Sequence, residues 1–175
     1  MKEKRKPLTA ATLTLIFLFA VSAGQANAQS ITNKFRVVNH ITKMEMVPAG
    51  DEKGHVVGIV TRGGLALFQN GEVANQTAVL LFDATLGKGG AYDTYSTITF
   101  EDGSTWVTKT KGSMERTPDQ KRMLTKQAGE FIKGTGKYEG IKGNVSYTGI
   151  QYGASETGKG DWIGDMEVTY TLPQK

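Results

Sequence analysis

The chain has 175 residues, with 21 basic and 17 acidic side chains, a formal net charge of +4 and no cysteine. This length suits one domain with its own core, and the lack of cysteine excludes disulfides, thiol catalysis and thiolate metal sites. The two histidines, His40 and His55, are far apart, and no cluster of acidic residues frames either one. The sequence therefore predicts no metal site.

The N-terminus has the pattern of a secretory signal peptide. A basic start precedes an uncharged run of 16 residues, Leu8 to Ala23, and Ala26-Asn27-Ala28 supplies the small residues of a cleavage site. The alternative is a membrane anchor, but the apolar run is shorter than the ~20 residues that span a bilayer. We expect cleavage after Ala28, export to the bacterial periplasm or the medium, and no stable membrane insertion afterwards.

Cleavage would leave a single domain, residues 29–175, and would change its charge. The signal peptide, residues 1–28, carries four basic residues and one acidic residue, so 17 basic and 16 acidic residues remain and the net charge falls to +1. The basic character of the whole chain belongs mainly to the leader. Composition therefore gives no support to a nucleic-acid partner, and we expect none.

The first half of this domain consists of short alternating runs typical of strands. The run Ile41–Met46 is expected to put Thr42, Met44 and Met46 on one face and Lys43 and Glu45 on the other. Two further runs, His55–Arg62 and Leu65–Asn70, are rich in β-branched and apolar residues. The run Glu72–Leu86 alternates, with one face formed by Ala74, Gln76, Ala78, Leu80 and Phe82.

A β-hairpin is predicted where Ala91–Phe100 meets Ser104–Gly112. Asp102-Gly103 between alternating runs favours a two-residue turn, because both positions tolerate positive φ. With that turn, Phe100 would face Thr105 and Ile98 would face Val107. The opposite face would then hold Tyr95, Thr99, Trp106 and Thr110. A longer loop would shift this pairing by one residue and exchange the faces.

One helix is expected, over Thr117–Ala128. Thr117, Pro118 and Gln120 have the spacing of an N-cap, a first-turn proline and a capping box, and Gly129 would end the helix. Strands then resume at Glu130–Lys133, near Tyr138–Tyr147 and over Asp161–Leu172, with a flexible loop at Gly153–Gly160. About eight short strands with one minor helix favour an antiparallel barrel or sandwich.

Residues 134–143, GTGKYEGIKG, pose the question of a phosphate-binding loop. The spacing is wrong for a Walker loop, since Ile141 rather than Lys follows Gly140. A dinucleotide fingerprint fails as well, because Glu139 occupies the third glycine position. The following residues are strand-like, so no helix N-terminus faces an anion. We interpret the segment as turns and close strand contacts, with Tyr138 as a buried plug and Gly140 and Gly143 at crowded positions.

The same segment carries a family resemblance. IKGTGKYEGIKGNVSYTG, residues 132–149, resembles the G-G-T-G-K-[FY]-x-G-x-x-G signature of allene oxide cyclase and dirigent barrels. The succession GHVVGIVTRGGLALFQNGEVA, AVLLFDATL and YSTITFEDGSTWVTKTKG is also similar to their strands. This chain differs in having Lys133 where the family often has glycine, and in the insert Thr117–Ala128. The likeness covers most of Phe35–Leu172.

The resemblance implies an all-β protein, an eight-stranded antiparallel calycin-like β-barrel, to which this chain is expected to add one short helical insert. It also implies an apolar cavity for a small lipophilic or aromatic ligand, often an oligomeric state, and no cofactor. Allene oxide cyclases and dirigent proteins steer reactive apolar molecules mainly by shape. If this chain is an enzyme, it is therefore expected to be an isomerase or cyclase. The alternative is a non-catalytic structural or oligomeric envelope protein whose barrel is filled by its own side chains.

Candidate site residues follow from the resemblance and from residue chemistry. The cyclases place a glutamate and an asparagine on the first strand, and the candidates here are Glu45 and Asn39. Glu45 has an alternative as an outward charge beside Lys43. Arg62 could bind a carboxylate through two hydrogen bonds or could be a surface arginine. The other candidate ligand-binding residues are Tyr95, Trp106 and Asn75. Tyr95 and Trp106 either line the cavity or pack elsewhere. Either Asn75 or its neighbour Gln76 must face inward, and His55 suits a rim position.

Overall fold

The computed structural model describes residues 29–174, apart from residue 120 and residues 154–158. The expected signal peptide lies outside the described residues, as does most of the expected loop Gly153–Gly160. No helix in the described part of the chain is long and apolar enough to cross a membrane. The strands are β1 (Ile31–Pro48), β2 (His55–Phe68), β3 (Val73–Thr85), β4 (Gly89–Thr99), β5 (Thr105–Arg116), β6 (Met123–Thr135), β7 (Lys142–Tyr152) and β8 (Asp161–Thr171).

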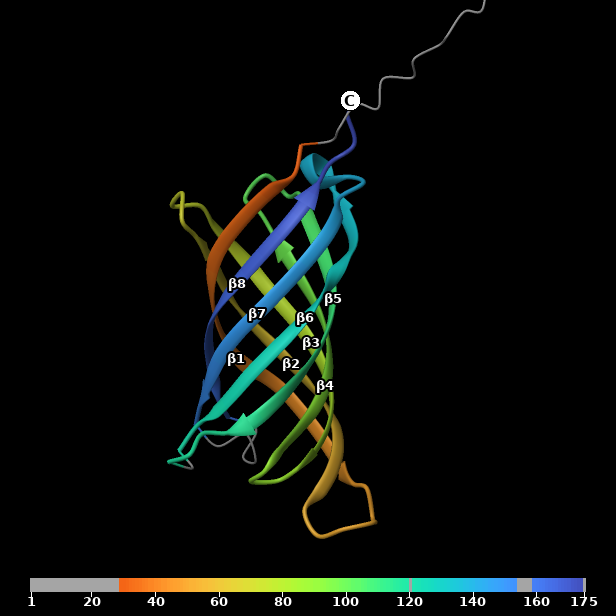
Figure 1. Cartoon of the computed structure of the whole chain (residues 1–175), viewed down its shortest axis with the longest axis vertical. Coiled ribbons are helices and arrows are strands. Elements are labelled where there is room, and N and C mark those ends of the chain that lie inside the picture. Colours follow the sequence, from red (N-terminus) through yellow and green to blue (C-terminus); the bar gives the residue numbers. More distant parts are fainter. Residues whose placement is uncertain (1–28, 120, 154–158, 175) are drawn as a thin grey trace, which may run out of the picture.

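These strands form one closed antiparallel barrel. Each strand pairs with its neighbours in the sequence, and β1 pairs with β8 from Ile31↔Tyr170 to His40↔Asp161 (Figure 1). The predicted eight-stranded antiparallel barrel is confirmed, and the sandwich alternative is excluded. Closure removes the free sheet edges and turns alternate residues of every strand toward the lumen.

The predicted helix over Thr117–Ala128 is wrong. Its start is a hairpin loop in which the backbone N–H of Thr117 donates to the carbonyl of Arg122 at 2.9 Å, and the Arg122 N–H donates to the Thr117 hydroxyl at 3.1 Å. The Thr117 hydroxyl also donates to Asp119 at 2.6 Å. Thr117, interpreted as the N-cap of a helix, thus helps to close the turn between β5 and β6. Buried Met123 and Thr125 alternate with less buried residues, which is the period of a strand.

The predicted pairing of the hairpin between β4 and β5 is wrong by one residue. The loop has three residues, Glu101–Gly103, because the Gly103 N–H donates to the Phe100 carbonyl and the Phe100 N–H donates to the Ser104 carbonyl, each at 3.0 Å. Gly103 has φ +78°, as a type I turn followed by a bulge requires.

This shift exchanges the expected faces of the hairpin. Ile98 pairs with Trp106, and both side chains are 1% exposed and face the lumen. Tyr95 points outward and is 38% exposed. The placement of Trp106 on the same face as Tyr95 is therefore corrected.

The expected alternation of Ile41–Met46 is wrong because β1 contains a bulge. The pairing with β2 shifts between Ile41 and Lys43. Ile41 and Met44 consequently both pack against the apolar residues of the lumen. Thr42 points outward instead and is hydrogen bonded to Thr61 at 2.9 Å. In β3, by contrast, the predicted face from Ala74 to Phe82 does line the lumen.

One end of the barrel is filled by aromatic rings and covered by η1 (Gly136–Tyr138), a single 3₁₀ turn. We call this the η1 end. Trp106 is at its centre, with ring centroids of Tyr138 at 4.9 Å, Phe100 at 5.0 Å and Phe131 at 5.4 Å. Such pairs each contribute roughly 0.5–1.5 kcal/mol beyond the burial of their area. The prediction of Tyr138 as a buried plug is confirmed.

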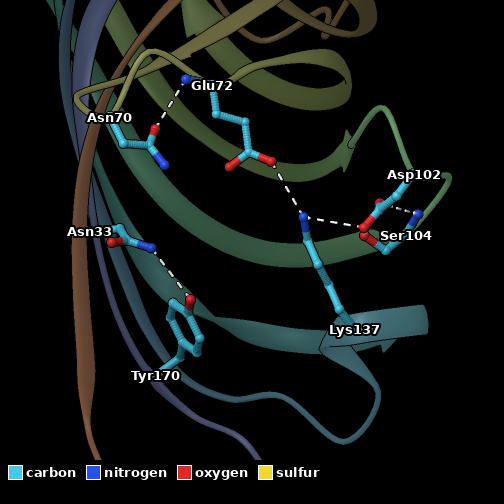
Figure 2. A network of polar contacts seen from close by, with 7 residues as sticks. All are labelled: Asn33, Asn70, Glu72, Asp102, Ser104, Lys137 and Tyr170. Carbon is cyan, nitrogen blue, oxygen red and sulfur yellow. Dashed lines mark hydrogen bonds and ion pairs between the residues drawn. The ribbon is translucent and has the colours of Figure 1, made fainter.

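A polar network fixes η1 over these rings. The Lys137 ammonium lies 3.3 Å from a carboxylate oxygen of Glu72 and 3.3 Å from one of Asp102 (Figure 2). It also lies 4.5 Å from the ring centroid of Phe100. Figure 2 shows the contacts reaching from η1 to the β2–β3 and β4–β5 loops. Lys137 therefore ties together three separate connections at the η1 end.

Glycines leave space for aromatic rings that lie flat on the inner wall. A Cβ at Gly164 would lie 2.5 Å from Cε2 of Tyr147 and 2.6 Å from Cα of Gly149. The predicted close packing is confirmed at Gly143 in β7, where a Cβ would meet the backbone of Thr169. A Cβ at Gly140 would meet Pro173, but Gly140 lies in the turn before β7 and not in a strand.

His55 fastens the β1–β2 loop to β3 at the opposite end. Its Nδ1 lies 2.5 Å from Asp51 and its Nε2 lies 2.6 Å from Asp83. The bonds to Asp83 and Asp51 raise the pKa of His55 above its ordinary value of 6.5. The bond to His55 lowers the pKa of Asp51. His55 therefore lies at the rim of the barrel, as expected.

Gly164→Ala is expected to destabilise the barrel by roughly 1–3 kcal/mol, because the added methyl group overlaps a ring and backbone that cannot both move. Gly63→Ala is the matched control, since its Cβ would meet only Thr42 Cγ2 at 3.4 Å. Urea unfolding of both variants measures the difference. Equal stabilities would contradict the role given to Gly164.

His55→Asn is expected to lower the melting temperature more at about pH 5.5 than at about pH 9. Because the folded pKa of His55 is raised, its contribution is complete below 6.5 and is lost as pH rises through the folded value. Thermal unfolding across this range measures the gap between variant and wild type. The same substitution at exposed His40 is the control. If the difference in melting temperature between variant and wild type grew with rising pH, the proposed His55 contacts with Asp51 and Asp83 would be refuted.

Candidate functional site

An apolar cavity of about 60 Å³ lies in the half of the lumen opposite the η1 end. We call this the cavity end. Val60, Leu80 and Tyr92 form its buried apolar cluster, against which Ile41, Met44, Phe82 and Met114 pack. Trp162 and Gln151 also line the cavity, as do Val56, Ala84, Leu86 and Met123.

A polar layer begins one inward-facing position beyond this cavity. Along β1, β2 and β4 the next lumen residues after Ile41, Val60 and Tyr92 are Asn39, Arg62 and Thr94. Their exposed fractions are 5%, 7% and 1%. The alternation of each strand therefore places a band of buried polar groups between the cavity and the aromatic rings of the η1 end.

Arg62 is the one charged side chain among the described residues that is buried. Its guanidinium carbon lies 4.6 Å from the centroid of the Trp162 ring. No carboxylate in the described part of the chain forms an ion pair with it, and its Nε has no hydrogen-bond partner there. Burial lowers the pKa of Arg62, but an arginine so far above neutrality keeps its charge.

Amide side chains continue the layer around Trp162. Gln151 and Asn39 flank Trp162 in register on β7 and β1. The Asn39 amide donates to the side-chain carbonyl of Gln76 at 3.0 Å. Nε2 of Gln151 and the hydroxyl of Thr94 have no hydrogen-bond partner among the described residues. Buried donors in proteins are usually paired, so these groups mark a place where a ligand could bind.

Two tyrosines adjoin the polar layer. Burial raises the pKa of Tyr92 to about 12, and the nearby charge of Arg62 opposes this rise. Burial likewise raises the pKa of Tyr147. Both phenols are therefore neutral at ordinary pH, so they act as hydrogen-bond donors rather than as bases. The Tyr92 hydroxyl donates to the carbonyl of Lys126 at 3.3 Å.

The structure brings only two of the predicted site residues together. Asn39 and Arg62 both lie in the polar layer. The sequence allowed Arg62 to be either a ligand contact or a surface residue, and the structure places it inside the barrel. Glu45 is on the outer wall, and its carboxylate lies 2.6 Å from the Lys43 ammonium with the side chain 61% exposed. The outward alternative for Glu45 is therefore the observed one.

The remaining predicted residues lie away from the cavity. Asn75 is exposed on the outer wall, and Gln76 is the inward member of that pair. Tyr95 is on the outer wall beneath Lys109. Trp106 is buried among the rings of the η1 end. Sequence reasoning missed Trp162, Gln151 and Thr94, whose only signal was alternation on β4, β7 and β8.

Comparison with solved structures relates this barrel to dirigent proteins. The pterocarpan synthase dirigent protein GePTS1 is similar over 84% of this chain and 93% of that protein, with a TM-score of 0.50 and 14% identity. The pterocarpan synthase dirigent protein PsPTS1 is similar over 83% of this chain and 97% of that protein, with a TM-score of 0.47 and 12% identity. No protein-family model and no curated protein matches the sequence. At such identity the likeness to GePTS1 is one of fold. This chain therefore has a dirigent-like β-barrel fold.

Proposed function

We propose that this protein binds a small lipophilic or aromatic molecule in the cavity end of its barrel. The observation that carries the proposal is an apolar cavity in a lumen whose other end is packed with rings. Small-molecule sites are typically apolar concavities with a few polar groups that fix orientation. The polar layer beyond the cavity supplies such groups.

Binding requires the cavity to widen, since ligand sites are usually several hundred Å³. Met44, Met114 and Met123 line the cavity from three different strands. Methionine side chains are unbranched and repack at low cost, so the walls can adapt to a guest. Entry is from the cavity end, because η1 and its polar network cover the other end.

Any turnover would depend on shape, on neutral donors and on the charged Arg62. No Asp or Glu faces the lumen among the described residues, and the phenols of Tyr92 and Tyr147 are neutral. Such a lumen suits guidance of a reactive molecule through a cyclisation or isomerisation without a cofactor. The fold shared with a pterocarpan synthase is consistent with that role. From the signal peptide pattern we infer export to the bacterial periplasm or the medium.

The second candidate is a non-catalytic structural or oligomeric envelope protein. The outer wall of β2 and β3 favours it, because outward positions 57–67 and 73–81 carry no charge. Several large apolar side chains are exposed there, namely Ile59, Leu65, Leu67, Val73, Val79 and Leu81. An apolar patch of this kind is typical of a protein–protein contact, here with a second copy of the chain.

Native mass spectrometry of protein purified from its own host is expected to show a retained small molecule and to report the subunit number. A mass equal to the polypeptide alone would favour the structural candidate over the binding protein.

Ala84→Val is expected to weaken binding of the neutral fluorescent probe N-phenyl-1-naphthylamine about tenfold, because two added carbons occupy a cavity of about 60 Å³. Ala91→Val, on the exposed outer wall, is the matched control and should bind as the wild type does. Fluorescence titration measures both affinities. Equal affinities would place the probe outside the cavity and contradict the proposal.

A further inference from the structure

The lumen contains a positive charge that the described protein residues do not neutralise. We propose that the ligand is a lipophilic acid, bound with its carboxylate inward on Arg62 and its apolar part in the cavity. This inference rests on the proposed ligand-binding function and specifies the ligand's chemical class.

Arg62 is not explained as a contribution to stability. Burying a charge without a partner is strongly unfavourable, and even a well-paired buried ion pair often gives no net stabilisation. Stacking on Trp162 at 4.6 Å offsets only part of this cost. An apolar side chain would therefore give a more stable empty barrel, so the arginine points to an anion that binds there.

The position of Arg62 fits an acid whose carboxylate lies deep in the lumen and whose apolar part lies nearer the entrance. Arg62 is the next inward-facing residue after Val60, which lines the cavity. Trp162 connects the two regions, since it lines the cavity and stacks on the guanidinium. A carboxylate at Arg62 would thus leave the rest of the molecule among apolar side chains.

Arg62 and other donors of the polar layer match a planar monoanion. The guanidinium can donate two parallel hydrogen bonds to the two oxygens of a carboxylate. The Thr94 hydroxyl and the Gln151 amide, each 1% exposed and without a partner among the described residues, provide further donors. Because Arg62 is the one buried charged side chain among the described residues, a phosphate dianion bound to it would keep an unpaired charge.

Matched probes test this inference in the wild-type protein. We expect octanoate to bind at least tenfold more tightly than 1-octanol or methyl octanoate at neutral pH, as measured by isothermal titration calorimetry. The octanoate affinity should fall when the pH drops below the pKa of the free acid, because the protonated acid loses its charge pairing. Equal affinities for the three probes would overturn the inference and leave the lipophile site intact, whereas binding of none would overturn both proposals.

Substitution at Arg62 identifies the residue responsible. Arg62→Met is expected to abolish the preference, so that octanoate and 1-octanol bind with similar affinity, and to raise the melting temperature of the empty barrel. Arg62→Lys should retain part of the preference, since the charge stays but the paired donors are lost. Arg36→Met, on the outer wall, is the matched control. An unchanged octanoate preference in a folded Arg62→Met variant would overturn the assignment. If the Arg62→Met variant does not fold, an Arg62→Lys variant that prefers octanoate over 1-octanol as strongly as the wild type would also overturn the assignment.

Discussion

The pairing of β1 with β8 is the constraint on which the rest of the structure depends. It joins the two ends of the chain's sheet and leaves every strand with two neighbours. Once the sheet is closed, half of the residues in each strand must share one narrow lumen. Whatever chemistry the interior has is therefore decided by which residues alternate inward, and at what height along the barrel each of them lies.

The lumen is divided into two parts with different physical roles. Around Trp106 the rings pack against each other, and Lys137 fixes η1 over them from outside. This packing supplies stability and closes one entrance. At the other end Val60 and Leu80 line a narrow cavity with adaptable methionines. Most of the aromatic rings in the lumen thus pack at the η1 end, and an apolar, deformable space lies at the cavity end.

Between these parts lies a layer that opposes stability. Arg62 is buried without an ion-pair partner in the described chain, and Thr94 and Gln151 keep unpaired donors beside the same region. Interiors normally satisfy their polar groups, and sites that do not are commonly those that bind something. The unsatisfied layer lies where the cavity meets the packed core, which is the position from which polar groups can orient a bound molecule.

The sequence by itself determined the β class, the likeness to a dirigent-type barrel fold, and the crowded glycines of residues 134–143, because these depend on local period and turn chemistry. It misjudged Thr117–Ala128, where the same side chains can cap a helix or close a hairpin. It also misjudged the faces of β4 and β5, because one extra loop residue exchanges inside and outside. Only the tertiary structure decided that Asn39 and Arg62 face the lumen while Glu45, Asn75 and Tyr95 do not, since a bulge and the loop lengths set each strand's register. The juxtaposition of Arg62 with Trp162 arises from β2 and β8, which are distant in sequence and are brought together when the barrel closes.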